Sequence, residues 1–256
     1  MIKASVYNAV EQCLDLLFPP RCRSCAEPGA GMDLCAPCYR RLPRNAAACR
    51  RCAVPMHRAG LLCGRCQAEE RAFDRIHAPW LYAPPLDRLI RGLKFHEDLP
   101  AGRLLGQLLA RRMQPSADAV DCLVPVPLHR SRLRERGFNQ AMELALVLSR
   151  RLGLPIAPEL LARERSTAAQ ADLPLAVRQR NVRGAFLANA AAAGLRVAVV
   201  DDVVTTAATA EAIAIALRRA GARRVEVWAP CRTPDPAQRS PGTQAGSGGF
   251  VKAGYY

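Results

Sequence analysis

Hydrophobic positions change their spacing along the chain near residue 73. Before it, three- and four-residue spacing in residues 1–17 predicts one amphipathic helix. After it, short apolar runs alternate with helical patterns. The strand-like runs are 121–127, 195–200 and 225–229, and the helical patterns are 86–93, 101–113, 141–148 and 208–220. Strands that alternate with helices predict an α/β fold, a parallel sheet with helices on both faces.

The same patterns divide the chain into three parts. Residues 1–70 hold the predicted amino-terminal helix and a cysteine-rich segment. Residues 71–233 hold the α/β pattern, and this length is enough to bury a sizeable core. Residues 234–256 are rich in Pro, Gly, Ser and Gln without an apolar period, which predicts a disordered tail.

No stretch of the sequence indicates export or a membrane span. The opening residues include Glu11, Asp15 and further polar breaks, so they lack the apolar region and cleavage site of a signal peptide. No other run approaches the roughly 18 apolar residues that cross a bilayer. The sequence therefore predicts a cytoplasmic protein.

Eight cysteines form four C-x-x-C pairs within the first 70 residues. Each pair places two thiolates on one side of a tight turn, and two pairs complete a tetrahedral shell around one zinc ion. In a reducing compartment this spacing indicates metal rather than disulfides. The pattern predicts one or two zinc ions and leaves sequential and interleaved pairing open. The predicted ligands are Cys22, Cys25, Cys35, Cys38, Cys49, Cys52, Cys63 and Cys66.

The chemistry of these ligands indicates a structural role for the zinc. A catalytic zinc keeps an open position and usually has histidine or carboxylate ligands, but His57 is the one histidine in the segment and lies near no vacant pair. The segment has few periodic apolar residues, so its folding should depend on metal. Chelation is expected to unfold the region before residue 70 and to spare most of the rest.

A strand-like run ends at two carboxylates, Asp201 and Asp202, and leads through small and hydroxyl residues into a helix. Ligands of parallel sheets bind at the carboxyl ends of strands, where the next helix directs free N–H groups at the site. Residues 205–209 can surround a phosphate, and the carboxylates can accept hydrogen bonds from ribose hydroxyls. The alternative is that these residues only cap the helix. The predicted site residues are Asp201, Asp202, Thr205, Thr206, Ala207, Ala208 and Thr209.

The motifs together resemble the ComF family, which includes DNA-uptake proteins of competent bacteria. The cysteine pairs, residues 93–95, 124–127 and 136–140, and the acidic motif follow that family's order, and the resemblance covers residues 10–233. It implies a type I phosphoribosyltransferase-like domain behind a double zinc ribbon. It also implies binding of phosphoribosyl diphosphate (PRPP) with Mg²⁺, with the two aspartates on the ribose and the threonine loop on the 5-phosphate.

The resemblance also indicates where the diphosphate would lie. The loop after Val126 is expected to face it, and basic residues between the strands could form a lid, although a solvated charged loop is the alternative. The residues assigned to this loop and lid are Pro127, Leu128, Arg136, Arg178, Arg180 and Lys94. The family usually has glycine at the position of Ala207. No catalytic residue or acceptor is identified, so transferase activity stays open; His129 and Glu135 are candidates by position alone.

The formal charge of +15, from 37 basic and 22 acidic residues, favours polyanionic partners. Solvated surface arginines are the alternative. One hypothesis is a PRPP-binding protein linked to DNA uptake, natural transformation or a nucleotide or sugar-phosphate process. A second is single-stranded DNA binding, for which the 5% aromatic content offers little stacking. A third is an adaptor that docks a DNA-uptake helicase or another competence protein.

Overall fold

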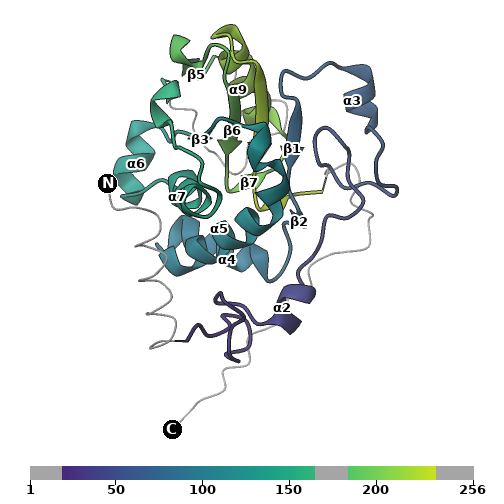
Figure 1. Cartoon of the computed structure of the whole chain (residues 1–256), viewed down its shortest axis with the longest axis vertical. Coiled ribbons are helices and arrows are strands. Elements are labelled where there is room, and N and C mark those ends of the chain that lie inside the picture. Colours follow the sequence, from purple (N-terminus) through teal and green to yellow (C-terminus); the bar gives the residue numbers. More distant parts are fainter. Residues whose placement is uncertain (1–18, 165–183, 235–256) are drawn as a thin grey trace.

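A computed structural model describes residues 19–164 and 184–234 (Figure 1). Four parallel strands form the central sheet in the order β1-β8-β6-β3. They span Arg75–His77 (β1), Cys122–Pro125 (β3), Arg196–Val200 (β6) and Arg224–Trp228 (β8). A smaller parallel sheet has the order β2-β9-β7, and β4 pairs with β5 in an antiparallel hairpin. These strands span Trp80–Leu81 (β2), Leu161–Arg163 (β4), Phe186–Ala188 (β5), Val203–Val204 (β7) and Cys231–Arg232 (β9).

Helices connect the strands and cover the central sheet. The described α-helices are Ala36–Arg40 (α2), Gly64–Ala68 (α3), Leu86–Phe95 (α4), Leu99–Met113 (α5), Arg130–Arg136 (α6), Gln140–Leu152 (α7) and Ala208–Arg219 (α9). Short 3₁₀ helices span Gln114–Ala119 (η1), Pro158–Leu160 (η2) and Ala190–Ala192 (η3). The helical patterns expected at 86–93, 101–113 and 208–220 correspond to α4, α5 and α9. The predicted helix in residues 1–17 and the tail after residue 234 lie outside the described residues.

Alternate side chains of β6 enter two different cores, because successive residues of a strand point to opposite faces of a sheet. Val197 and Val199 pack with Ile213 of α9 in one core, called here the α9-side core. Ala198 and Val200 pack on the other face with leucines of α4, α5 and α7, called the α5-side core. These four residues of β6, 197–200, are fully buried. The parallel sheet with helices on both faces is therefore confirmed.

The cysteine-rich segment is divided between these two cores. Cys22 and Cys35 belong to the α5-side core, whereas Cys49, Cys52 and Cys66 belong to the α9-side core. Figure 1 shows α2 below α4 and α5, while α3 lies beside the sheet near α9 and β1. The segment thus shares its buried surface with the α/β part of the chain.

The connection between the two parts is fixed to α9 by side chains of the helix. Glu211 accepts a hydrogen bond from the backbone N–H of Ala72 at 3.0 Å, and Arg218 donates to the Ala72 carbonyl at 3.2 Å. Arg218 also forms an ion pair with Asp74. Among the described residues, no helix combines the length and apolar character needed to cross a membrane.

Candidate functional site

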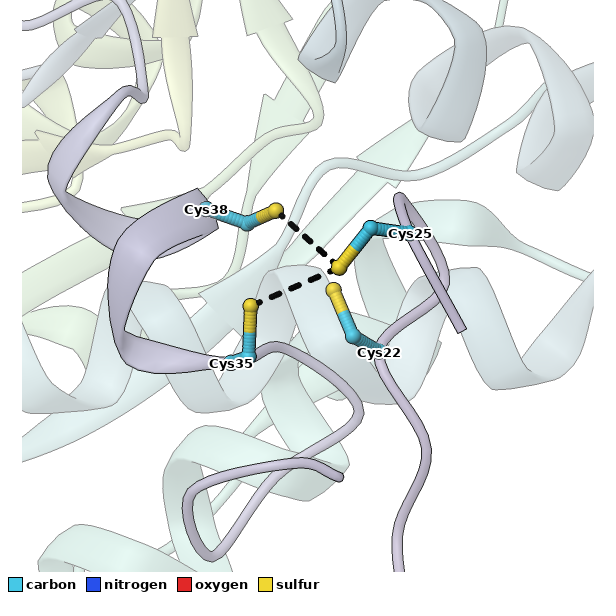
Figure 2. A group of neighbouring side chains, drawn as sticks. All are labelled: Cys22, Cys25, Cys35 and Cys38. Carbon is cyan, nitrogen blue, oxygen red and sulfur yellow. Dashed lines mark hydrogen bonds between the residues drawn. The ribbon is translucent and has the colours of Figure 1, made fainter. Parts of the chain in front are cut away.

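The eight predicted zinc ligands form two groups in sequential order. Cys22, Cys25, Cys35 and Cys38 make up the first group (Figure 2), and Cys49, Cys52, Cys63 and Cys66 the second. In each group the sulfur atoms all lie within 4.8 Å of one another. All eight are free thiols. The structure thereby decides between the pairings that the spacing leaves open.

The two groups are built alike by the local backbone. Ala26 and Ala53 each follow the second cysteine of the first pair, and both have left-handed φ values, of 62° and 54°. Cys35 and Cys63 are the N-caps of α2 and α3, so each later pair begins at the start of a helix. The two groups also have similar spacing in the sequence, because each consists of two C-x-x-C pairs separated by nine or ten residues.

The environment of Cys49 favours a thiolate, the form in which cysteine binds zinc. Burial alone raises the pKa of this thiol, but backbone N–H groups of Cys52, Cys63 and Arg51 outweigh the burial and lower it to about 7. The N–H of Cys63 lies 3.3 Å from the Cys49 sulfur. Four sulfur ligands fill a tetrahedral zinc shell and leave no coordination position for water or substrate. Each group therefore fits a structural zinc.

The acidic pair follows the carboxyl end of β6. The Asp201 N–H donates to the Trp228 carbonyl, and the Asp201 side chain accepts a hydrogen bond from the Asp202 N–H at 2.9 Å. Asp202 is 8% exposed, and its Oδ2 lies 3.1 Å from the Nζ of Lys94 at the end of α4. Lys94, expected on the diphosphate lid, is thus positioned against the acidic pair.

The surroundings of Asp201 favour its protonated form. Burial raises the pKa of Asp201 to about 7, and the neighbouring Asp202 carboxylate adds to the increase, while the Lys94 ammonium opposes it. The guanidinium of Arg163 on β4 is close enough to Asp201 for the two charges to interact. Burial lowers the pKa of Arg163, and the positive charge of Arg132 on α6 lowers it further. Arg163, which is one of the basic residues between the predicted strands, therefore lies near Asp201, and Arg132 lies near Arg163.

Between β7 and α9 the chain makes a tight turn at residues 205–207. Ala207 has φ 61° and ψ 8°, the left-handed conformation that favours glycine. The hydroxyl of Thr206 accepts a hydrogen bond from the N–H of Ala208, the first residue of α9. The turn and the amino end of α9 therefore supply the arrangement of hydroxyl and N–H groups that suits a phosphate.

The loop after β3 lies at the edge of the central sheet where the acidic pair follows β6. Pro125 pairs with Val200 in the β3–β6 register, so Pro127 and Leu128 follow at the edge that carries Asp201. Asn139 fixes this loop, because its side-chain amide donates to the Val126 carbonyl at 3.0 Å. The Asn139 side-chain oxygen also accepts from the Ala141 N–H, which caps α7.

Further candidate residues lie on α6 and around it. The Cζ atom of Arg136 lies 5.4 Å from the centre of the Phe95 ring, and Phe95 is 65% exposed. His129 caps α6 by accepting a hydrogen bond from the N–H of Ser131, which gives it a structural contact. Arg178 and Arg180 lie outside the described residues.

A cavity of about 740 Å³ borders the turn. Thr206, Ala207 and Ala208 line one side, and Arg65 and Arg71 of the cysteine-rich part line another. Its volume is in the range of small-molecule sites. The sequence patterns did not predict this approach of the cysteine-rich part to the turn.

Comparison with known proteins identifies the cysteine-rich part. Residues 13–67 match the double zinc ribbon domain family. The fold and the two cysteine groups thus define an α/β protein with a double zinc ribbon, and the predicted fold class is confirmed.

Relatives align over most of the chain. DNA utilization protein YhgH of Salmonella typhimurium is 35% identical over 225 residues, 85% of this chain and 99% of the relative. The protein of the same name from Escherichia coli K12 is 36% identical over the same shares. Competence protein F of Haemophilus influenzae is 30% identical, over 76% of this chain and 88% of the relative. The chain belongs to the ComF family of these proteins, as its motifs indicated.

Solved structures give weaker, partial matches. The Bacillus subtilis glutamine phosphoribosylpyrophosphate amidotransferase complexed with ADP and GMP is 27% identical, with a TM-score of 0.35, over 49% of this chain and 25% of that chain. TT1426 from Thermus thermophilus is 26% identical, with a TM-score of 0.32, over 54% of this chain and 77% of that chain. The chain thus spans about a quarter of the amidotransferase.

Proposed function

We propose that the edge of the sheet between β3 and α9 binds PRPP together with Mg²⁺. The arrangement of Asp201, Asp202 and the left-handed turn at Ala207 carries this proposal. The two carboxylates accept hydrogen bonds from the ribose hydroxyls, and the turn with the first N–H groups of α9 holds the 5-phosphate. PRPP brings a diphosphate, whose oxygens hold the Mg²⁺.

The surrounding charges support a phosphorylated ligand. Lys94 contacts Asp202 directly, Arg163 lies near Asp201, and the loop at Pro127 lies at the same edge. Cations around a ribose-phosphate site stabilise the negative charge of a diphosphate. We expect binding first of all; transfer of the phosphoribosyl group to an acceptor would be a further step.

A thermal-shift titration tests the proposal. PRPP with Mg²⁺ should raise the unfolding temperature, because a ligand that binds only the folded state stabilises it. The double variant Asp201→Asn and Asp202→Asn should lose this shift. Asp118→Asn is the matched control, since exposed Asp118 lies in η1, before the opposite end of β3. No shift at millimolar PRPP, or an unchanged shift in the double variant, would contradict the proposal.

A second function, binding of single-stranded DNA, is supported by the surface around α6. The seven residues of α6 include four arginines and no buried residue, and Leu133 is 44% exposed. Phe95 is exposed beside Arg136. Arginines beside an exposed ring suit phosphates and stacked bases. The names of the relatives, DNA utilization protein and competence protein, agree with this function.

An oligonucleotide titration distinguishes this surface from the PRPP site. The variant Phe95→Leu and the pair Arg130→Gln with Arg134→Gln should weaken binding of a single-stranded oligonucleotide, and the wild-type affinity should fall steeply with salt. The Asp201→Asn and Asp202→Asn variant should still bind it. Salt-independent binding, or equal affinity in the α6 variants, would contradict the second function.

A further inference from the structure

Arg232 lies between the second cysteine group and the turn at residues 205–207. It is the last residue of β9 and is 4% exposed. Its Nε donates to the Cys52 carbonyl at 3.2 Å, and its Nη1 donates to the carbonyls of Val204, Thr205 and Thr233. One guanidinium therefore joins the backbone of a zinc ligand to the backbone of the turn.

The two joined segments face each other across a narrow space. A cavity of about 50 Å³ is lined by Cys52 and Cys63 on the zinc-ribbon side and by Thr205, Thr206 and Ala207 on the other. Cys52 and Arg232 are 180 positions apart in the chain, so only folding brings them together. A charge-assisted hydrogen bond at a buried place is among the stronger polar contacts of a protein.

The bond to Thr205 determines how the turn presents its N–H groups. In a planar trans peptide the C=O and the following N–H point in opposite directions. Because the Thr205 carbonyl points at Arg232, the N–H of Thr206 points away from Arg232 and the zinc ribbon. The next residues are the left-handed Ala207 and the first turn of α9.

We propose that Arg232 is a positioning residue through which the second zinc group holds the phosphate turn in its binding conformation. The zinc fixes the backbone at Cys52, Arg232 transmits that position to the Thr205 carbonyl, and the turn keeps its N–H groups directed at the phosphate. The binding part of this inference rests on the proposed PRPP function, whereas the coupling of zinc group and turn does not.

The substitution Arg232→Lys tests the coupling in the full-length zinc-loaded protein. Lysine keeps the charge but cannot span the Cys52 and Thr205 carbonyls with a rigid fork. We expect amide exchange at Ala208 and Thr233, both hydrogen bonded in the structure, to become about tenfold faster, and PRPP·Mg²⁺ affinity to fall about tenfold. Zinc content, measured by metal analysis, should stay at the wild-type level.

Arg196→Lys is the matched control. Arg196 also lies on a strand and bonds a backbone carbonyl, that of Asp118, but at the opposite edge of the sheet. This variant should change neither the exchange at Ala208 nor the PRPP affinity. Equal exchange at Ala208 in the Arg232→Lys and Arg196→Lys variants would overturn the proposal.

A second test removes zinc ligands and leaves Arg232 unchanged. Cys63→Ser removes a ligand of the second group and should speed exchange at Ala208, while Cys25→Ser removes a ligand of the first group and should affect it far less. Equal effects of the two serine variants would also overturn the coupling. If the wild-type protein binds no PRPP, the proposed function fails, and the exchange measurements still decide the role of Arg232.

Discussion

The ammonium of Lys94 and the carboxylate of Asp202 form an ion pair of 3.1 Å that joins the end of α4 to the segment after β6. Their side chains are 23% and 11% exposed, so the pair is screened less than a surface pair. Removing one member of a buried pair leaves an uncompensated charge. Lys94 therefore links the stability of this edge to the charge of the proposed site.

Loss of the Lys94 ammonium should destabilise the fold. Lys94→Met is expected to lower the free energy of unfolding by about 1–3 kcal/mol at neutral pH. Lys94→Arg keeps the positive charge and should retain most of the wild-type stability. Urea unfolding of Lys94→Met, Asp202→Asn and the double variant forms a cycle that isolates the pair. Effects of the two single variants that add without interaction would show that the contact contributes nothing.

Glycine at position 207 should stabilise the protein. A left-handed L-residue costs about 1–2 kcal/mol, and the greater unfolded-state entropy of glycine offsets about 0.4–1 kcal/mol of the gain. Ala207→Gly is therefore expected to raise the free energy of unfolding by about 0.5–1 kcal/mol and the unfolding temperature by about 1–4 °C.

The same substitution bears on the phosphate. Glycine lets the backbone approach a phosphate without a side chain between them, so Ala207→Gly should tighten PRPP binding several-fold. Calorimetric titration measures this, with Asp201 and Asp202 still required. Equal or weaker binding by the glycine variant would argue against a phosphate at this turn.

Stability should fall as the pH rises through the titration of Asp201. The pKa of this carboxyl is about 7 in the folded protein, above its ordinary value of 3.8, because of burial and Asp202. Between these pH values the folded state holds more protons than the unfolded state, so the free energy of unfolding decreases with increasing pH and then levels off. Urea unfolding at pH 5 and pH 8 should show this decrease, and Asp201→Asn should reduce it. Identical pH dependence in both proteins would refute the assignment.

Zinc removal should affect the whole described protein. The sequence alone suggested that chelation would spare the part after residue 70, but the cysteines share both cores with that part, so we now expect chelation to destabilise it as well. We expect about two zinc ions per chain. A strong chelator should lower the unfolding temperature, and the protein should unfold in one transition. Trp80 and Trp228 share the α5-side core with Cys22 and Cys35, so their fluorescence should shift to longer wavelength. Unchanged fluorescence and unfolding temperature after complete zinc removal would contradict this prediction.

Local patterns along the chain predicted much of the architecture. The three- and four-residue spacing indicated α4, α5, α7 and α9, and the apolar runs indicated β3, β6 and β8, because helices and strands bury one face or both at a fixed period. The strands of two or three residues, β2, β7 and β9 among them, are too short to show a period. The family usually has glycine at position 207, and the structure was needed to show that Ala207 has a left-handed φ there.

Spacing and residue type alone indicated that eight cysteines bind metal in fours and that two aspartates end a buried strand, since both are local properties. Tertiary contacts were needed to show which cysteines form a group, that the groups belong to cores on opposite faces of the sheet, and that Lys94 contacts Asp202. Folding also brought Arg232 between Cys52 and Thr205. These contacts join residues far apart in the chain, and their geometry depends on how whole elements pack, which no local periodicity encodes.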